Sequence, residues 1–285
     1  MSIEGYTEFK WFLVTSPAEY VAHVQTNRPN KFNAYHEPMW LELNQIFNKL
    51  SSDPNVRAVV FSGAGDKAFT TGLDVQAASQ GGILGSGAGE NKLDIARQSV
   101  NIRRHVQEFQ DCISSIEKCE KPVIAAIHGY AFGLAIDISC CTDIRIASKD
   151  TKFSVKEVDI GIAADIGTLA RLPKIVGNHG WVKEVALTAR IFSAEEAQQV
   201  GFVSHVTENK EQAVAKAVGL ATLIASKSPV AVQGTKELLN HARENTTAAT
   251  LRYTGVWNSA NLHTDDVKSA LLSGIQKTKP TFSKL

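Results

Sequence analysis

The stretch RAVVFSG, residues 57–63, decides the fold class of this chain. Its centre is a continuous run of β-branched and apolar side chains, without the polar alternation of a half-exposed strand. Such runs are typical of strands that are covered on both faces, as strands in parallel sheets are. The stretch therefore predicts a parallel sheet that lies between layers of helices.

Buried strands and helices alternate on both sides of this stretch. We expect further strands at residues 20–25, 123–127, 144–147 and 153–158. We expect helices between them at residues 34–50, 93–119 and 134–141. Helical patterns then dominate from residue 181 onward, at 181–189, 194–199, 210–225, 230–242 and 247–276. The alternation predicts an α/β core that is followed by a helical C-terminal region.

Two segments between these elements are expected to be irregular. Residues 129–133 have a glycine at each end and predict a turn. Residues 80–91 contain five glycines and predict a mobile loop.

The composition argues against several classes of protein. The chain has 285 residues, 44% of them hydrophobic and 21% charged, which is typical of a globular protein. Its 30 basic and 29 acidic residues nearly balance, whereas a protein that binds nucleic acid or an anionic membrane as its main function needs an excess or a patch of basic residues. Residues 122–142 are nearly uncharged but contain proline, histidine, glycine and aspartate, so we expect a buried strand, turn and helix and no membrane span. The cysteines lack metal or redox spacing and are expected to be reduced core residues: Cys112, Cys119, Cys140 and Cys141.

The two ends of the sequence carry information about targeting. Residues 1–14 include Glu4 and Glu8 and lack the pattern of a secretory or mitochondrial leader. The last three residues, Ser283-Lys284-Leu285, spell the peroxisomal address that an import receptor reads. We therefore expect a peroxisomal protein that has this receptor as a partner.

Two carboxylates stand at unexpected places in VKEVDIGIAADIGTLAR, residues 155–171. In a strand at 153–158, Glu157 shares a face with Phe153 and Val155, and Asp165 follows an uncharged run just before a helix start. Burying an unpaired carboxylate is costly, so acids in apolar surroundings are usually paired, metal-bound or catalytic. Two plainer interpretations stay open, in which Glu157 lies on a solvated strand edge and Asp165 is a helix N-cap.

Two glycine turns can place backbone amides beside these acids. In TGL at residues 71–73 and FGL at residues 132–134, the glycine allows a sharp turn that exposes the next amide, as an oxyanion hole requires. The helix expected after Gly133 points its positive end toward the same place. An ordinary strand-to-helix turn explains either glycine as well. Asp137, the sole charged residue in 122–142, is either part of this site or a paired structural acid.

Four blocks of the sequence resemble the crotonase, or enoyl-CoA hydratase/isomerase, superfamily, and they occur in that family's order. The blocks are RPNKFNA (28–34), RAVVFSGAGDKAFTTGLDV (57–75), KPVIAAIHGYAFGLAID (121–137) and FSVKEVDIGIAADIGTLARLPKIVGN (153–178). Within the superfamily, the acids of the last two blocks and AVQGTKELL at residues 231–239 are most similar to the Δ3,5-Δ2,4-dienoyl-CoA isomerases. The resemblance extends over residues 20–268.

The resemblance implies a fold, a substrate class and an assembly. It implies a crotonase-like ββα spiral core at residues 1–205 and a C-terminal helical trimerisation region at residues 206–285. Acyl-CoA thioesters are the implied substrates, and the implied assembly is a homo-oligomer, a trimer or hexamer, in which C-terminal helices complete neighbouring sites. No separate cofactor is expected, because coenzyme A is part of the substrate. No metal is expected either, because the histidines lack HxxxH and HExxH spacing.

Carried over residue by residue, the resemblance implies an oxyanion hole and three acids. The backbone N–H groups of Leu73 and Leu134 hold the thioester oxygen. Glu157 removes the C2 proton, Asp165 delivers a proton at C6, and Asp137 orients or tunes this pair, although either of the first two acids could start the transfer. The residues implied to line the substrate are Thr71, Gly72, Leu73, Asp74, Val75 and Leu134. The implied reaction converts a 3,5-dienoyl-CoA to its 2,4 isomer.

This chain departs from other members of the superfamily at the acids and at Leu134. Hydratases carry two glutamates where this chain has Asp137 and Glu157, and a glycine where it has Asp165. Many members have glycine in place of Leu134, and some isomerases do not. Leucine keeps the backbone amide, but its side chain borders the oxyanion hole and so affects how the acyl chain fits.

Other interpretations remain open. The activity of a Δ3,Δ2-enoyl-CoA isomerase or of an enoyl-CoA hydratase is an alternative, which an assay on the matching substrates distinguishes. A non-catalytic acyl-CoA-binding protein on the same scaffold is a second alternative, and it predicts that Glu157 and Asp165 are dispensable. Arg28 and Lys31 either contact CoA phosphates or lie in a solvated loop.

Overall fold

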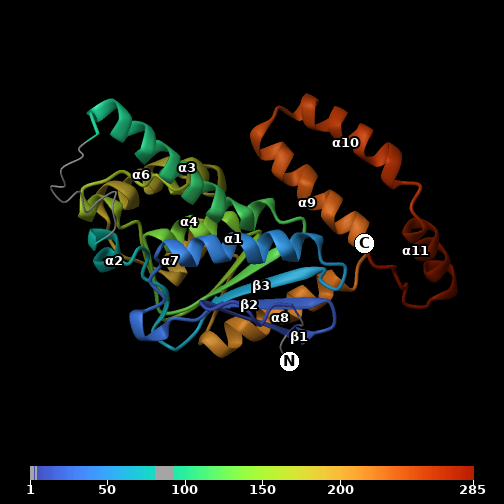
Figure 1. Ribbon diagram of the computed structural model, residues 1–285. Coiled ribbons are helices and arrows are strands. Elements are labelled where there is room, and N and C mark those ends of the chain that lie inside the picture. Colours follow the sequence, from blue (N-terminus) through green and yellow to red (C-terminus); the bar gives the residue numbers. More distant parts are fainter. Residues whose placement is uncertain (1–2, 4, 81–92) are drawn as a thin grey trace.

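The computed structural model describes residue 3 and residues 5–80 and 93–285, and these form two sheets (Figure 1). The larger sheet consists of β1 (Phe12–Ala18), β2 (Val21–Thr26), β3 (Ala58–Gly63), β5 (Val123–Ile127), β7 (Ile144–Ser148) and β10 (His205–Thr207), in this order. All neighbours in it are parallel except β1 and β2. The predicted parallel sheet is therefore confirmed. The segment predicted as a mobile loop lies outside the described residues, apart from Gln80 at the end of α2 (Val75–Gln80).

Helices cover both faces of the larger sheet. Consecutive side chains of a strand point to opposite faces, so apolar side chains on both faces can pack against helices. Along β3, Val59 and Phe61 pack in one apolar cluster with α1 (Glu37–Ser52) and α3 (Ile95–Lys118). Ala58 and Val60 point the other way and pack against α8 (Lys210–Ala225). Figure 1 shows α1 on one side of the sheet and α8 on the other. The helix α8 contacts the strands through alanines spaced four residues apart, whose small side chains permit a close approach: Ala213, Ala217, Ala221 and Ala225.

The smaller sheet is built from short strands that each follow a long strand of the larger sheet. β4 (Ala68–Thr70) follows β3, β6 (Tyr130–Phe132) follows β5, and β8 (Lys152–Ser154) follows β7, while β9 (Phe192–Ser193) completes the sheet. The prediction of a turn at residues 129–133 was wrong for residues 130–132, because these three pair with β4 and β8. The repeated unit of a long strand, a short strand and a helix agrees with the expected ββα core.

The predicted strand at residues 153–158 is wrong in its second half. β8 ends at Ser154, whose carbonyl accepts a hydrogen bond from the N–H of Gly133 at 2.9 Å. Glu157 then begins a short 3-10 helix, η2 (Glu157–Ile160). The surroundings of Glu157 are therefore set by contacts with other segments and not by strand periodicity.

Most predicted helices are confirmed, with small differences at their ends. α8 has the predicted bounds, as do α4 (Leu134–Cys141) and α7 (Ala194–Gln199). The other described helices are η1 (Pro29–Lys31), α5 (Thr168–Ile175), α6 (His179–Thr188), α9 (Pro229–Glu244), α10 (Thr247–Asn261) and α11 (Asp265–Gln276). The single helix predicted at 247–276 was wrong, because the Thr264 hydroxyl caps a new helix start by accepting from the N–H of Asp266. β1 was not predicted at all.

The C-terminal helices divide into two groups. α8 covers the sheet, whereas α10 and α11 lie away from both sheets, at the right of Figure 1. Large apolar side chains on these last two helices are exposed, including Leu251, Val256, Leu271 and Ile275. Within the described residues, no single helix has the length and hydropathy of a membrane span, and α8 with α9 meets that test only as a pair bent by 112°.

Candidate active site

The candidate site lies where three short strands end. β4, β6 and β8 are neighbours in the smaller sheet and run parallel, so the segments that follow them come side by side. Gly72 and Leu73 follow β4, Gly133 and Leu134 follow β6, and Glu157 follows β8. Sheet pairing thus gathers predicted site residues that are far apart in the sequence.

Gly72 and Gly133 are required by the close approach of their two turns. Their φ angles are +90° and +54°, a region that residues with side chains rarely adopt. A Cβ on Gly72 would lie 2.8 Å from the carbonyl oxygen of Phe132 and 3.3 Å from the nitrogen of Leu134. The two turns are therefore in contact, and the backbone of Leu134 lies directly beside the first turn.

The N–H groups of Leu73 and Leu134 are available to bind an oxygen. Next to Leu73, Gly72 and Asp74 make the hydrogen bonds of a bridge to Tyr35, both at 2.8 Å, and the N–H of Leu73 takes no part in them. Leu134 is the first residue of α4, where a backbone N–H has no partner in its own helix. Among the residues that the structure describes, neither N–H has an acceptor.

Glu157 holds its carboxylate beside the second turn. Its Oε1 lies 3.4 Å from the position that a Cβ on Gly133 would take. Its Oε2 is buried and has no hydrogen-bond partner within the described part of the chain. Burial raises the pKa of Glu157 to about 7, and the charges of Asp137 and Asp165 add to this rise. A carboxyl group with this pKa can take up and return a proton near neutral pH, as a general base must.

Asp137 is buried in α4 and is hydrogen bonded to the start of α5. Its Oδ1 accepts from the backbone N–H of Thr168 at 2.6 Å and from the hydroxyl of the same residue at 2.8 Å. Burial raises the pKa of Asp137 to about 6, although the two bonds from Thr168 oppose the rise. The hydrogen bonds of Asp137 are therefore those of a paired structural acid. Its charge also raises the pKa of Glu157.

Asp165 belongs to the loop before α5, and its side chain is exposed. Its carbonyl accepts from Nε2 of Gln110 on α3 at 2.5 Å. Its charge adds to the rise that burial causes in the pKa of Glu157 and of Asp137. The N-cap of α5 is Gly167, so the N-cap interpretation of Asp165 is wrong. The sequence predicted apolar surroundings for both Glu157 and Asp165. This prediction is right for Glu157 and wrong for Asp165, because the loop before α5 carries Asp165 to the surface of the chain.

The residues that flank the turn at Gly72 differ in their surroundings. Thr71 is half-buried and Val75, the first residue of α2, is exposed. Asp74 forms an ion pair with Arg28, with 2.7 Å between Oδ2 and Nη1, and both side chains are largely buried. The solvated-loop interpretation therefore fits Lys31, which is exposed, but not Arg28.

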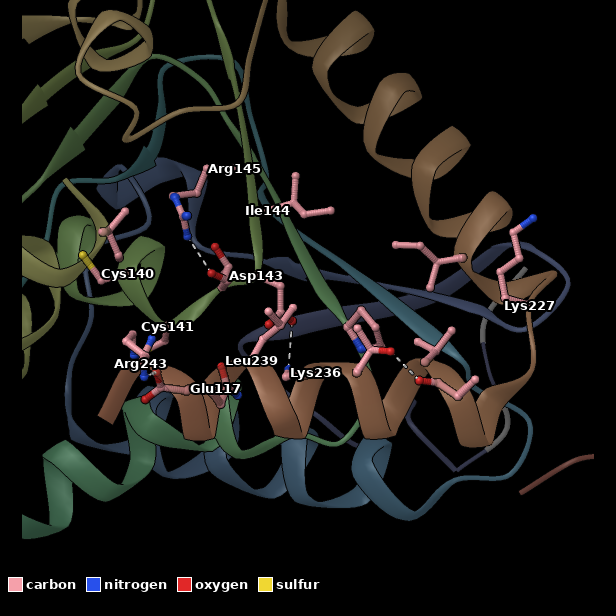
Figure 2. A pocket seen from close by; sticks show the side chains of 18 residues that line it. Glu117, Cys140, Cys141, Asp143, Ile144, Arg145, Lys227, Lys236, Leu239 and Arg243 are labelled. Atoms are coloured by element: carbon pink, nitrogen blue, oxygen red, sulfur yellow. Dashed lines mark hydrogen bonds and ion pairs between the residues drawn. The ribbon is translucent and has the colours of Figure 1, made fainter. Parts of the chain in front are cut away.

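Two cavities lie around the place where α3, α5 and α9 meet. One has a volume of about 400 Å³ and is lined by Asp165 and Arg171. The other, of about 530 Å³, lies between α9 and the segment that joins α4 to β7, and no predicted catalytic residue lines it (Figure 2). Glu117 and Arg243 line both cavities. The larger of these two cavities therefore lies away from the predicted catalytic residues, whereas the smaller one is lined by Asp165.

Three residues at this junction were missed by sequence reasoning: Glu117, Thr168 and Arg171. Thr168 holds Asp137, and the spacing of 31 residues between them has no local signal in the sequence. Arg171 lies on α5 and binds Glu117 of α3, with 2.9 Å between Nη2 and Oε2. Only the position of Arg171 one helical turn after Gly167 could have drawn attention to it.

By the distances between its ligand atoms, one group among the described residues could hold a metal ion. Its members are Glu37, His105 and Glu108, whose ligand atoms lie within 4.8 Å of one another. They come from α1 and α3, and none of them is a predicted catalytic residue.

Comparison with known proteins identifies the family of the chain. A family model described as Enoyl-CoA hydratase/isomerase matches residues 17–284. The chain belongs to the enoyl-CoA hydratase/isomerase family, and the predicted fold class is confirmed.

Two relatives are named as isomerases of the same kind. A human protein named Delta(3,5)-Delta(2,4)-dienoyl-CoA isomerase, mitochondrial, is 44% identical over 275 residues, which cover 95% of this chain and 82% of that protein. An Arabidopsis thaliana protein named Delta(3,5)-Delta(2,4)-dienoyl-CoA isomerase, peroxisomal, is 41% identical over the whole of both chains. A crystal structure of an enoyl-CoA hydratase from Bacillus anthracis superposes with a TM-score of 0.85 at 27% identity, over 96% of this chain and 99% of that one.

Proposed function

We propose that this chain isomerises 3,5-dienoyl-CoA thioesters to their 2,4-dienoyl isomers. The observation that carries the proposal is the buried, unpartnered Oε2 of Glu157 beside two contacting turns with free amides. A charge that develops next to Glu157 can be bound by the N–H groups of Leu73 and Leu134. The dienoyl-CoA isomerases that are 41–44% identical over nearly the whole chain support the same reaction.

The reaction moves one proton and two double bonds. Glu157 takes the proton from C2, and the electron pair of that bond delocalises over the 3,5-diene and the thioester carbonyl. The resulting enolate oxygen accepts hydrogen bonds from Leu73 and Leu134, each of which is worth about 2.7–4 kcal/mol of transition-state stabilisation in such sites. Asp165 gives a proton to C6, and the double bonds then stand at positions 2 and 4. The proton on Glu157 then returns to Asp165, either directly or by loss to water and uptake of a proton from water, which restores the starting state.

The three acids have different surroundings that suit different roles. The burial that raises the pKa of Glu157 to about 7 lets it act as a base and then lose its proton again. Asp165 is exposed and lines the cavity of about 400 Å³, so it can exchange protons with solvent. Asp137 stays bonded to Thr168 and acts on Glu157 through its charge.

The assay that tests the proposal compares two substrate classes. Wild-type protein is given a 3,5-dienoyl-CoA and, separately, a 2-enoyl-CoA. Absorbance follows the conjugation of the diene with the thioester carbonyl in the first case and the addition of water to the double bond in the second. We expect isomerisation to dominate, and its loss in Glu157→Gln and Asp165→Asn. Predominant water addition would support a hydratase instead, and full activity in both variants would support a non-catalytic binding protein.

Oligomerisation is part of the proposal. The exposed apolar side chains on α10 and α11 favour a homo-oligomer, a trimer or hexamer, because such surfaces are usually covered in solution. Light scattering of the purified protein tests this. A monomer at micromolar concentration would contradict it.

The proposed compartment is the peroxisome. The tripeptide Ser283-Lys284-Leu285 and the relative named peroxisomal support it, although other relatives of similar identity are named mitochondrial. A fluorescent fusion that keeps the tripeptide exposed should enter peroxisomes, and deletion of residues 283–285 should prevent this. Entry into mitochondria with either version would contradict the proposal.

A further inference from the structure

Arg171, which forms an ion pair with Glu117, also lies next to the turn that holds Asp137. It lies one turn into α5, and its guanidinium folds back over the start of its own helix. A Cβ on Gly167 would overlap with Nη1 of Arg171 and would lie 3.9 Å from Oδ1 of Asp137. The positive charge of Arg171 lowers the pKa of Asp137, against the larger effect of burial. Arg171 is therefore close to the turn from Gly167 to Thr168 that holds Asp137.

A second set of contacts fixes this guanidinium from the other side. Nη2 donates to the hydroxyl of Ser114 at 2.8 Å, and Nε donates to Oε2 of Glu117 at 3.0 Å. Oε1 of Glu117 in turn binds Arg243, at the end of α9. Glu117 and Arg243 are labelled in Figure 2, where they lie side by side. The side chains of Arg171, Glu117 and Arg243 are only 16%, 17% and 24% exposed, so solvent screens these contacts weakly.

The charges at this junction explain why an arginine stands here. Burial is the main cause of the raised pKa values of Asp137 and Glu157, and the charge of Asp165 raises both further. A planar guanidinium can hold Glu117 and Ser114 through separate N–H groups and still place positive charge beside Gly167. Lysine has one nitrogen and cannot make this arrangement.

We propose that Arg171 is a positioning residue for the isomerase reaction, whose guanidinium holds the turn from Gly167 to Thr168 and, through it, Asp137 and the loop that carries Asp165. The inference rests on the proposed function of this site. Asp137 receives both of its hydrogen bonds from Thr168, the residue after Gly167. Asp165 lies two residues before Gly167, and its carbonyl is held by Gln110 of the same helix α3 that carries Glu117. A shift of Arg171 therefore moves two of the three acids together.

The first test measures steady-state kinetics of Arg171→Gln on a 3,5-dienoyl-CoA. Misplacing acids that do not bind the CoA portion should lower kcat by about 10- to 100-fold and change KM by less than about threefold. Glu117 keeps Arg243 as a partner, so the melting temperature should fall little. Arg171→Lys, which keeps the charge without the fork, should recover part of kcat. The matched control is Lys174→Gln on the same helix, which breaks an exposed pair with Glu244 and should leave kcat unchanged.

A double-mutant cycle separates positioning from a purely structural role. Because Arg171 acts in part through Asp137, the loss of kcat caused by Arg171→Gln should be smaller, by about threefold or more, when Asp137→Asn is already present. An equal loss in both backgrounds, or a kcat of Arg171→Gln within about twofold of wild type, would overturn the inference. Wild-type turnover in the same assay reports on the proposed function separately. Normal wild-type turnover with an unaffected Arg171→Gln removes only the inference, whereas absent wild-type turnover removes both.

Discussion

Oδ1 of Asp137 accepts two hydrogen bonds from Thr168, one from the backbone N–H at 2.6 Å and one from the hydroxyl at 2.8 Å. These bonds join the buried helix α4 to the first residue of α5. Because α4 also carries the amide of Leu134 at its start, the same helix connects the turn at Gly133 with the loop that carries Asp165. The relative positions of the acids and the amides therefore depend on this contact.

Replacing Thr168 with valine should destabilise the protein. The variant keeps the shape of the side chain and the backbone bond but leaves Asp137 with one hydrogen bond fewer in a buried place. We expect the free energy of unfolding to fall by about 1–2 kcal/mol, measured by urea denaturation. Thr222→Val, which removes an exposed hydroxyl bond inside α8, is the control and should stay within about 0.5 kcal/mol of wild type. Equal stability of the two variants would show that the bond to Asp137 contributes nothing.

Glu157→Gln should raise stability in a pH-dependent way. Native Glu157 keeps its proton up to about pH 7, whereas an unperturbed glutamate loses it near 4.5. Between these pH values the native state binds more protons than the unfolded chain, so the contribution of Glu157 falls as pH rises. The gain from Glu157→Gln should thus be small at pH 4.5 and grow toward pH 7, up to the order of 3 kcal/mol. Melting curves of both proteins across this range measure the difference, and a gain independent of pH would contradict the raised pKa.

Hydrogen exchange at C2 should distinguish the two proposed proton carriers. In deuterium oxide, Asp165→Asn should still exchange the C2 hydrogens of a 3,5-dienoyl-CoA while its turnover falls by about 10²–10⁴-fold, because Glu157 is intact. Glu157→Gln should lose both exchange and turnover. Mass spectrometry of recovered substrate measures the exchange. Asp159→Asn, an exposed acid paired with Lys156, is the control and should behave as wild type. Exchange that survives in Glu157→Gln but not in Asp165→Asn would reverse the assigned roles.

Gly72→Ala should damage the proposed oxyanion hole. The new methyl would lie 2.8 Å from the carbonyl oxygen of Phe132, and φ at this position is +90°, so the turn must move. We expect kcat to fall by about 10²–10³-fold, as after the loss of one oxyanion donor. Gly219→Ala, inside α8 with no atom within 4 Å of the new methyl, is the matched control. It should keep full activity and gain about 0.5–1 kcal/mol of stability from the better helix propensity. Activity of Gly72→Ala close to that of Gly219→Ala would exclude the first turn from the site.

Local patterns in the sequence predicted the elements whose burial or starting point depends on a few neighbouring residues. The strand after Arg57 is buried on both faces, and its side chains divide between the two apolar clusters as expected. The helix after Gly133 begins where the glycine allows it. The strand predicted through Glu157 failed because β8 is only three residues long. Its length is set by pairing with β6 and β9, which no local pattern records.

The amino-acid sequence by itself determined the alternation of strands and helices, the two glycines that permit tight turns, and the presence of acids after them. Periodicity and backbone sterics act over a few neighbouring residues, so they can be read directly. The tertiary structure alone decided that the amide of Leu134 lies against Gly72, that Thr168 binds Asp137, and that Arg171 stands beside Gly167. The first two of these contacts join residues that the chain separates by tens of positions, and they form because parallel pairing of short strands and packing of α4 on α5 bring those segments together.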